Sequence, residues 1–133
     1  MNQYIVDTIA LARYLENKLP LKVNEIFESA EKGEAQLLIP EIVIGELIYT
    51  LRKGRLAIED ISVVENQILQ ELETASYFNF ISLDFQAWKR FLELDIPELH
   101  DRMIAAAFVK DDHIAVLTND EKIIDTGIAC IWD

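Results

Sequence analysis

The stretch ELHDRMIAAAFVKDDHIAVLTNDEK, residues 98–122, decides the fold that the sequence predicts. An acid, Asp101, stands at the start of an apolar, helix-forming segment over residues 103–109, and this pattern predicts a buried helix. After a charged turn, the β-branched and apolar run Ile114–Leu117 predicts a short buried strand. Asp120 follows just beyond that strand. The segment therefore predicts a helix–turn–strand unit with one carboxylate near the start of the helix and another beyond the end of the strand.

Two acids upstream occupy comparable positions. The β-prone run Gln3–Val6 ends on Asp7, which is also placed to be an ordinary N-cap of the helix that follows. In the helix predicted for Glu41–Arg52, Glu46 is the only charged residue of the apolar segment Ile42–Leu51. Burying a lone carboxylate is costly, so Glu46 is expected to be paired, protonated or bound to a metal, unless it reaches solvent at the edge of an apolar face.

The remaining chain alternates predicted strands with predicted helices. Strands are expected at Gln3–Val6, Ala35–Ile39, Tyr77–Leu83, Ile114–Leu117 and Ile128–Trp132. Further helices are expected at 9–15, Leu21–Lys32, from Asp60 through Leu72, at Phe85–Leu94 with Trp88 and Phe91 in the core, and as one turn at Lys122–Asp125. Helices between consecutive strands imply right-handed crossovers and a mostly parallel sheet, whose strand ends gather ligands and chemistry.

Length and composition limit the class of protein. With 133 residues and 51% hydrophobic residues, the chain is expected to form a single domain, residues 1–133, with a real core. No apolar run reaches the roughly 20 residues that a membrane-spanning helix needs, and the N-terminal residues lack the features of a signal peptide. The lone Cys130 excludes an intramolecular disulfide and a cysteine-based zinc site. A cytoplasmic location is the default expectation.

The net charge of −12 repels polyanions, unless bound cations or a local basic region offset it. It suits a partner with basic segments or a site that gathers divalent cations, although solubility alone would also explain it. Clustered carboxylates raise one another's pKa values, and Mg²⁺ or Mn²⁺ would relieve this repulsion. The sequence contains no glycine-rich phosphate loop, which excludes a P-loop nucleotide site. His100 is interpreted as a surface or helix-start residue that could support Asp101, and His113 as structural.

Four segments together resemble the successive motifs of the PIN domain family, and more narrowly its short VapC-type toxins. They are YIVDTIALARYL from Tyr4, IPEIVIGELIYTL from Ile39, ELHDRMIAAAFV from Glu98 and VLTNDEKI from Val116. The most specific parts are H-D-x-x-I-A-A-A at His100–Ala107 and T-x-D at Thr118–Asp120.

The resemblance implies a fold, a site and an activity. The fold is a three-layer α/β/α sandwich around a mostly parallel sheet. Asp7, Glu46, Asp101 and Asp120 match the acidic motif positions and would bind Mg²⁺ or Mn²⁺, with Thr118 in support and Asp125 as a weaker spare acid. The implied activity is metal-dependent hydrolysis of RNA by an activated water. Family members commonly form homodimers and are silenced by a small antitoxin, so both partners are expected here.

Alternatives remain open from the sequence. An RNA-processing nuclease without an antitoxin would carry the same acids, and a non-catalytic PIN-like module would bind RNA or protein without cleaving it. A receiver-like phosphoacceptor is disfavoured because the first strand ends on one acid instead of a pair, and the second ends at Ile39-Pro40.

Overall fold

Five parallel strands form one sheet in the order β3-β2-β1-β4-β5, and the computed structural model describes them with all other residues of the chain, 1–133. The strands are β1 (Asn2–Val6), β2 (Ala35–Pro40), β3 (Phe78–Ile81), β4 (Ala115–Leu117) and β5 (Cys130–Ile131). The helices are α1 (Thr8–Leu15), α2 (Leu21–Glu31), α3 (Glu41–Arg52), α4 (Ile61–Thr74), α5 (Phe85–Glu93), α6 (Leu99–Ala107) and α7 (Glu121–Ile124). Every predicted strand and helix is present, and the predicted α/β class is confirmed.

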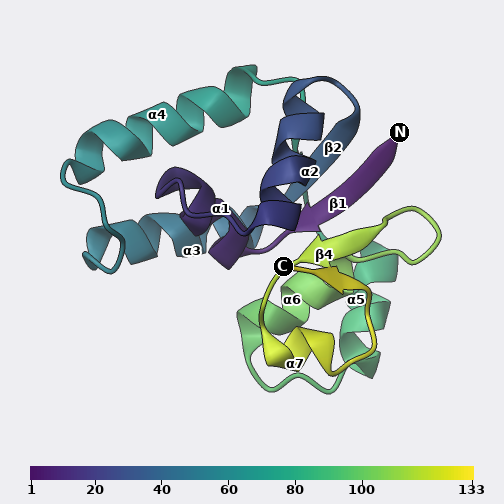
Figure 1. Ribbon diagram of the computed structural model, residues 1–133. Helices are drawn as coiled ribbons and strands as arrows, with labels where there is room; N and C mark the ends of the chain where they lie inside the picture. The colour runs from purple at the N-terminus through teal and green to yellow at the C-terminus, as the bar shows by residue number, and fades with distance from the viewer.

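The connections place helices on both faces of the sheet and so produce the three-layer α/β/α arrangement. The chain moves from β1 to β2 and β3 in one direction, then returns past β1 to β4 and β5. With right-handed crossovers, α1–α4 cover one face and α5–α7 cover the other. Figure 1 shows these two groups of helices on opposite sides of the strands. The direction of winding reverses between β1 and β4, and such a reversal leaves a crevice at the carboxyl ends of the strands.

The register brings the ends of β1 and β4 together. Val6 lies opposite Leu117, and the backbone N–H of Asp7 donates to the carbonyl of Leu117 at 3.3 Å. Asp7 and Thr118, the residues that follow the two strands, therefore begin from neighbouring points of the sheet.

One apolar cluster forms the core, built mainly from the sheet and the helix faces that cover it. Ile5, Val6, Leu37, Ile39, Val116 and Leu117 of the inner strands are fully buried. These strands are continuous apolar runs because helices cover both of their faces. No helix is long and apolar enough to cross a membrane.

The structure corrects several details of the prediction. Trp88 was expected in the core, but it is 43% exposed because it lines an open hollow between α5, α6 and the start of α3, whereas Phe91 is half-buried. The last strand is only Cys130–Ile131, shorter than the predicted Ile128–Trp132. Strand β2 includes Pro40, which the sequence placed after the strand. Proline is tolerated there because it is the last strand residue and directly precedes α3.

Candidate acidic site

The four predicted acids line one hollow of about 400 Å³ at the carboxyl end of the sheet. Asp7 follows β1 and Asp120 follows β4 by three residues, while Glu46 lies in the middle of α3 and Asp101 in the first turn of α6. Four segments far apart in the sequence thus contribute one carboxylate each. We call this space the acidic hollow.

Asp7 is the buried acid of the group, with only 5% of its surface exposed. It is the N-cap of α1, since its Oδ1 accepts a hydrogen bond from the Thr8 backbone N–H at 2.6 Å. Its other oxygen accepts a hydrogen bond from the Thr118 hydroxyl. Burial raises the pKa of Asp7 to about 6, the two hydrogen bonds oppose that rise, and the charges of Glu46 and Asp120 add to it. The N-cap role and the site position are therefore compatible in one residue.

Glu46 is held by two polar side chains from other helices. The Thr8 hydroxyl donates to its Oε1 at 2.8 Å, and His100 Nδ1 lies 3.0 Å from its Oε2. Its side chain is 25% exposed, so this carboxylate is neither isolated in the core nor free in solvent. The same His100 nitrogen lies 3.5 Å from Glu98 Oε1. These contacts fix the direction in which Glu46 enters the acidic hollow.

Asp101 and Asp120 form a closely interacting pair. Burial, followed by hydrogen bonding and charge from the neighbouring Asp120 carboxyl, raises the pKa of Asp101 to about 7. The Asp101 backbone N–H donates to Glu98 Oε2 at 2.7 Å, so Glu98 caps α6 and orients its first turn. Asp120 is positioned by its own backbone N–H, which donates to the Thr118 hydroxyl at 3.0 Å.

Thr118 connects two of the acids. It is fully buried, donates to Asp7 and accepts from the Asp120 backbone. Replacing its hydroxyl by a methyl group would leave the Asp7 oxygen without its donor in a buried setting, which is costly. Thr118 therefore positions two acids that come from the ends of different strands.

The four acidic side chains are of the chemical type that binds a hard divalent cation. All four are carboxylates, the ligand type that Mg²⁺ and Mn²⁺ prefer. Burial raises the pKa values of Asp7 and Asp101 and the neighbouring acids add to this rise, so a bound cation would stabilise their ionised forms. In their present positions, no three His, Cys, Asp or Glu side chains are arranged to hold an ion together. Binding would therefore require these carboxylates to turn toward a common centre.

Three other residues singled out in the sequence lie as follows. Asp125 is exposed, caps the end of α7 and does not line the acidic hollow. His100 is at the start of α6, as expected, and also contacts Glu46. His113 takes no part in the contacts of the four acids. It accepts a hydrogen bond from the Val109 backbone N–H at 2.9 Å, in keeping with a structural role.

Thr8 and Glu98 were not predicted as parts of the site. The contact of Thr8 with Glu46 bridges 38 positions of sequence. Glu98 could have been noticed from its place three residues before Asp101, because an N-cap side chain accepts from the N–H of N2 or N3.

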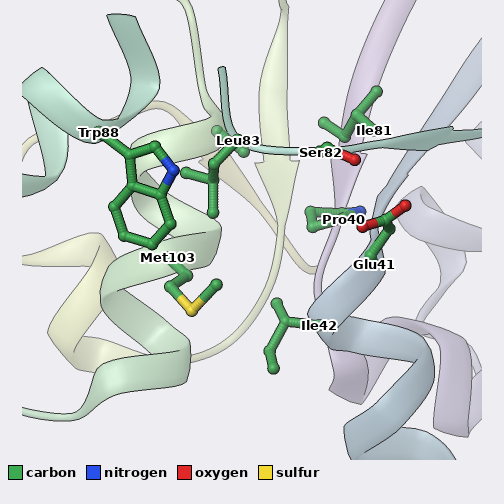
Figure 2. A pocket seen from close by; sticks show the side chains of 9 residues that line it. Pro40, Glu41, Ile42, Ile81, Ser82, Leu83, Trp88 and Met103 are labelled. Atoms are coloured by element: carbon green, nitrogen blue, oxygen red, sulfur yellow. The ribbon is translucent and has the colours of Figure 1, made fainter. Parts of the chain in front are cut away.

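A separate hollow of about 230 Å³ lies between the start of α3 and the helices α5 and α6. Figure 2 shows Ile42 facing Met103 and Trp88 across this space, with Leu83 above and Pro40 beside it. Its lining is mostly apolar, and Glu41 is its only carboxylate. It does not offer the donor set that the acidic hollow does.

Comparison with known proteins identifies relatives over almost the whole chain. The family model described as the PIN domain matches residues 4–129. No curated protein matches the sequence. The fold is similar to VapBC of Salmonella typhimurium, solved bound to DNA, with a TM-score of 0.70 and 20% identity over 98% of each chain.

Two further solved structures share the fold. VapBC2 of Rickettsia felis, bound to a DNA fragment from its promoter, has a TM-score of 0.69 and 18% identity over 98% of this chain and 99% of the other. VapC20 of Mycobacterium tuberculosis, described as a toxin that cleaves the sarcin–ricin loop, has a TM-score of 0.65 and 15% identity over 98% and 99% of the two chains.

Proposed function

Because the chain belongs to the PIN domain family, we propose that it is a Mg²⁺- or Mn²⁺-dependent endoribonuclease and the toxin of a type II toxin–antitoxin pair. The observation that carries the proposal is the convergence of Asp7, Glu46, Asp101 and Asp120 on one hollow at the switch point of a parallel sheet. The similarity in fold to a toxin that cleaves RNA in the sarcin–ricin loop supports the choice of RNA as substrate.

The chain's own residues would hold and orient the reacting groups. Asp7, Asp101 and Asp120 would be the main ligands, because Asp7 and Asp120 follow the two central strands and share Thr118 as a partner, and Asp101 interacts closely with Asp120. Glu46 enters from the opposite side of the hollow, oriented by Thr8 and His100. A bound divalent cation would polarise the scissile phosphate and lower the pKa of water in the site.

The protonation states of Asp7 and Asp101 also favour a bound cation. At neutral pH the raised pKa values leave Asp101 partly protonated, with Asp7 closer to full ionisation. A cation bound among these acids would hold them ionised, since a positive charge stabilises carboxylates. The acids would then accept the proton released when water attacks the phosphodiester, with no histidine needed as the general base.

We propose a small antitoxin and a second copy of this chain as the partners. The VapBC complexes among the similar structures contain an antitoxin with the toxin, which supports the first partner. From the sequence, we expected an antitoxin groove lined by the first helices, around Leu11, Tyr14 and Leu15, and by the helix that carries Glu46. Leu11 is fully buried, and the other two pack against the core, so these residues are not free for such a contact. The antitoxin contact is better assigned to the open side of α3, near Glu46.

Incubation of the purified protein with a mixed RNA pool tests the activity. The expected result is cleavage that requires Mg²⁺ or Mn²⁺, stops with a chelator, and leaves 3′-hydroxyl and 5′-phosphate ends. Asp101→Asn purified in parallel controls for a contaminating nuclease, and equal cleavage by both preparations would reject the proposal. Products with 2′,3′-cyclic phosphates would reject hydrolysis by water, because they require attack by the ribose hydroxyl.

Co-expression with the neighbouring small gene, if one is present, tests the toxin assignment. Co-purification with loss of nuclease activity is the expected result. A nuclease that no neighbour-encoded protein binds or inhibits would support an RNA-processing role instead.

A further inference from the structure

A second hollow, of about 540 Å³, continues from the acidic hollow along α3. The two spaces share Glu46, Thr50 and Arg55 in their linings, and the second one adds Tyr49 and Lys53. We call this second space the basic hollow. A chain bound with one phosphodiester at the acids would extend into it.

The end of α3 fixes the position of Arg55. Gly54 adopts a positive φ of 68°, which glycine accepts without strain, and the helix ends there. The Gly54 backbone N–H donates to the Leu51 carbonyl at 3.0 Å, and the Arg55 N–H donates to the Thr50 carbonyl at 3.4 Å. This pair of hydrogen bonds turns the chain back over the last helical turn. Arg55 is thereby returned to the rim that it shares with Glu46.

The loop beyond Arg55 is also anchored. The Ala57 backbone N–H donates to a carboxylate oxygen of Glu16 at 3.0 Å, and Glu16 lies at the end of α1. Leu56 packs against the core. The backbone on both sides of Arg55 is therefore held to the body of the protein.

Some of the basic side chains in this region are paired with acidic side chains, and others are not. Arg13 pairs with Glu16, and Arg52 Nε lies 2.8 Å from Glu65. Lys53 and Arg55 are exposed and form no ion pair. In a chain of net charge −12, the basic hollow thus carries two unbalanced positive charges next to the acids.

An exposed aromatic ring completes the lining. Tyr49 is 69% exposed, and Lys53 Nζ lies 5.3 Å from the centroid of its ring. An exposed large aromatic side chain in a polar hollow offers a flat surface for stacking. Aromatic rings beside unbalanced cations are the combination with which proteins bind single-stranded nucleic acid.

We propose that Tyr49, Lys53 and Arg55 form a subsite for one nucleotide of single-stranded RNA, adjacent to the phosphodiester held at the acids. The two cations contact the neighbouring phosphate, and the Tyr49 ring stacks on the base. This inference rests on the proposed function for its substrate, but its binding step is independent of cleavage. It also explains how RNA approaches so acidic a protein, since the strand enters through a side of the site with free positive charge.

Binding of a fluorescently labelled single-stranded RNA, measured by anisotropy in EDTA over a range of salt concentrations, tests the subsite without cleavage. Each cation that neutralises an RNA phosphate adds about 0.7 to the slope of log K against log salt. Because Lys53 and Arg55 contact the same phosphate, the double variant Lys53→Ala/Arg55→Ala should reduce the slope by about that amount, and each single variant should reduce it by less. Tyr49→Leu should weaken binding on the order of tenfold with little change in the slope.

Two variants serve as matched controls. Arg52→Ala removes the same charge three positions from Arg55, but this guanidinium is paired with Glu65 and lines neither hollow. Lys89→Ala removes a lysine that also lies over an aromatic ring, Phe85, at 6.0 Å, but on α5. Both should bind RNA as the wild type does. Equal weakening in the controls would overturn the subsite, because it would show an effect of overall charge alone.

Hydrolysis of bis(p-nitrophenyl) phosphate in Mn²⁺ separates the subsite from the acids. This small diester has no neighbouring nucleotide, so Arg55→Ala should affect its hydrolysis far less than that of RNA, for which KM should rise several-fold. RNA cleavage with unchanged KM in the Tyr49, Lys53 and Arg55 variants would overturn the subsite and leave the nuclease proposal standing.

The remaining outcomes also decide between the two proposals. Wild-type protein that binds RNA through Arg55 but cleaves nothing would support the subsite and reject the nuclease. An Arg55→Ala variant that no longer binds the antitoxin but still binds RNA would overturn the RNA assignment in favour of a protein-binding surface.

Discussion

Replacing Asp7 by Asn should make the metal-free protein more stable at alkaline pH. Asp7 is buried, and its pKa is raised from 3.8 to about 6 by that burial. Because the folded-state pKa lies above the unfolded one, the folded state binds the proton more tightly, and stability is lost as pH rises through about 6. The Asn side chain cannot ionise, and its oxygen can still cap α1.

The magnitude follows from the difference between the two pKa values. At 1.36 kcal/mol per pKa unit, ionising Asp7 in the folded state costs about 3 kcal/mol at pH 8. At pH 5 the group is mostly protonated in the folded protein, and the cost is about half as large. The stability of Asp7→Asn relative to wild type should therefore rise by roughly 1–2 kcal/mol between pH 5 and pH 8.

Urea unfolding in EDTA at these two pH values measures the difference, and comparing the two pH values cancels the constant effect of the amide. Adding saturating Mg²⁺ at pH 8 should reverse the order, because the wild type gains stability from binding and the variant gains much less. A stability difference that does not change with pH, or that moves in favour of the wild type at pH 8 without metal, would refute the reasoning about Asp7.

Three other measurements test the site. Mg²⁺ should raise the melting temperature of Glu46→Gln and Asp120→Asn clearly less than that of the wild type. Asp84→Asn, a change at a helix cap, should respond to Mg²⁺ as the wild type does. Equal responses in all of these proteins would exclude a shared metal site. Thr118→Val should destabilise the protein by about 1–3 kcal/mol, and by more at pH 8 than at pH 5 because Asp7 is ionised at pH 8. Urea unfolding that shows no loss of stability would contradict the hydrogen-bonding role of Thr118. Mn²⁺ affinity, followed by calorimetry, should rise from pH 5.5 to pH 8 as Asp7 and Asp101 lose their protons, and a flat profile would argue against ligation by these two acids.

Much of the fold followed from local patterns. The inner strands are apolar on both faces and bounded by turns or acids, so short runs such as Ile114–Leu117 were enough to predict them. The ends of the outer strands were not predictable, because pairing with a single neighbour fixes them. Strand β5 pairs with β4 through only two residue pairs, and the apolar residues around it do not extend the ladder.

Trp88 shows why apolar character alone does not place a residue. Trp88 faces the hollow between α5, α6 and the start of α3, and because no neighbouring element fills this hollow, the ring remains 43% exposed however apolar it is. Sequence pattern assigns a residue to a helix, but the neighbouring element decides which side of that helix is buried.

The four acids and the supporting Thr118 were predicted, whereas the roles of Thr8 and Glu98 and the contact of His100 with Glu46 were not. Each acid stands at a recognisable place, either beyond a strand or alone in an apolar helix, and the motifs of the family add to that signal. Thr8 and His100 reach Glu46 across 38 and 54 positions of sequence. Such contacts depend on how α1, α3 and α6 approach one another at the end of the sheet, which no local pattern records.

The most direct test of the central claim is the anomalous scattering of Mn²⁺ in crystals of the protein. The four-carboxylate site predicts one or two peaks in the acidic hollow, within about 2.0–2.5 Å of oxygens from at least two of Asp7, Asp101 and Asp120. Crystals of Asp101→Asn grown in the same Mn²⁺ should show the peaks weakened or lost. Saturating Mn²⁺ that gives no peak in the acidic hollow, or a peak only elsewhere on the molecule, would contradict the account.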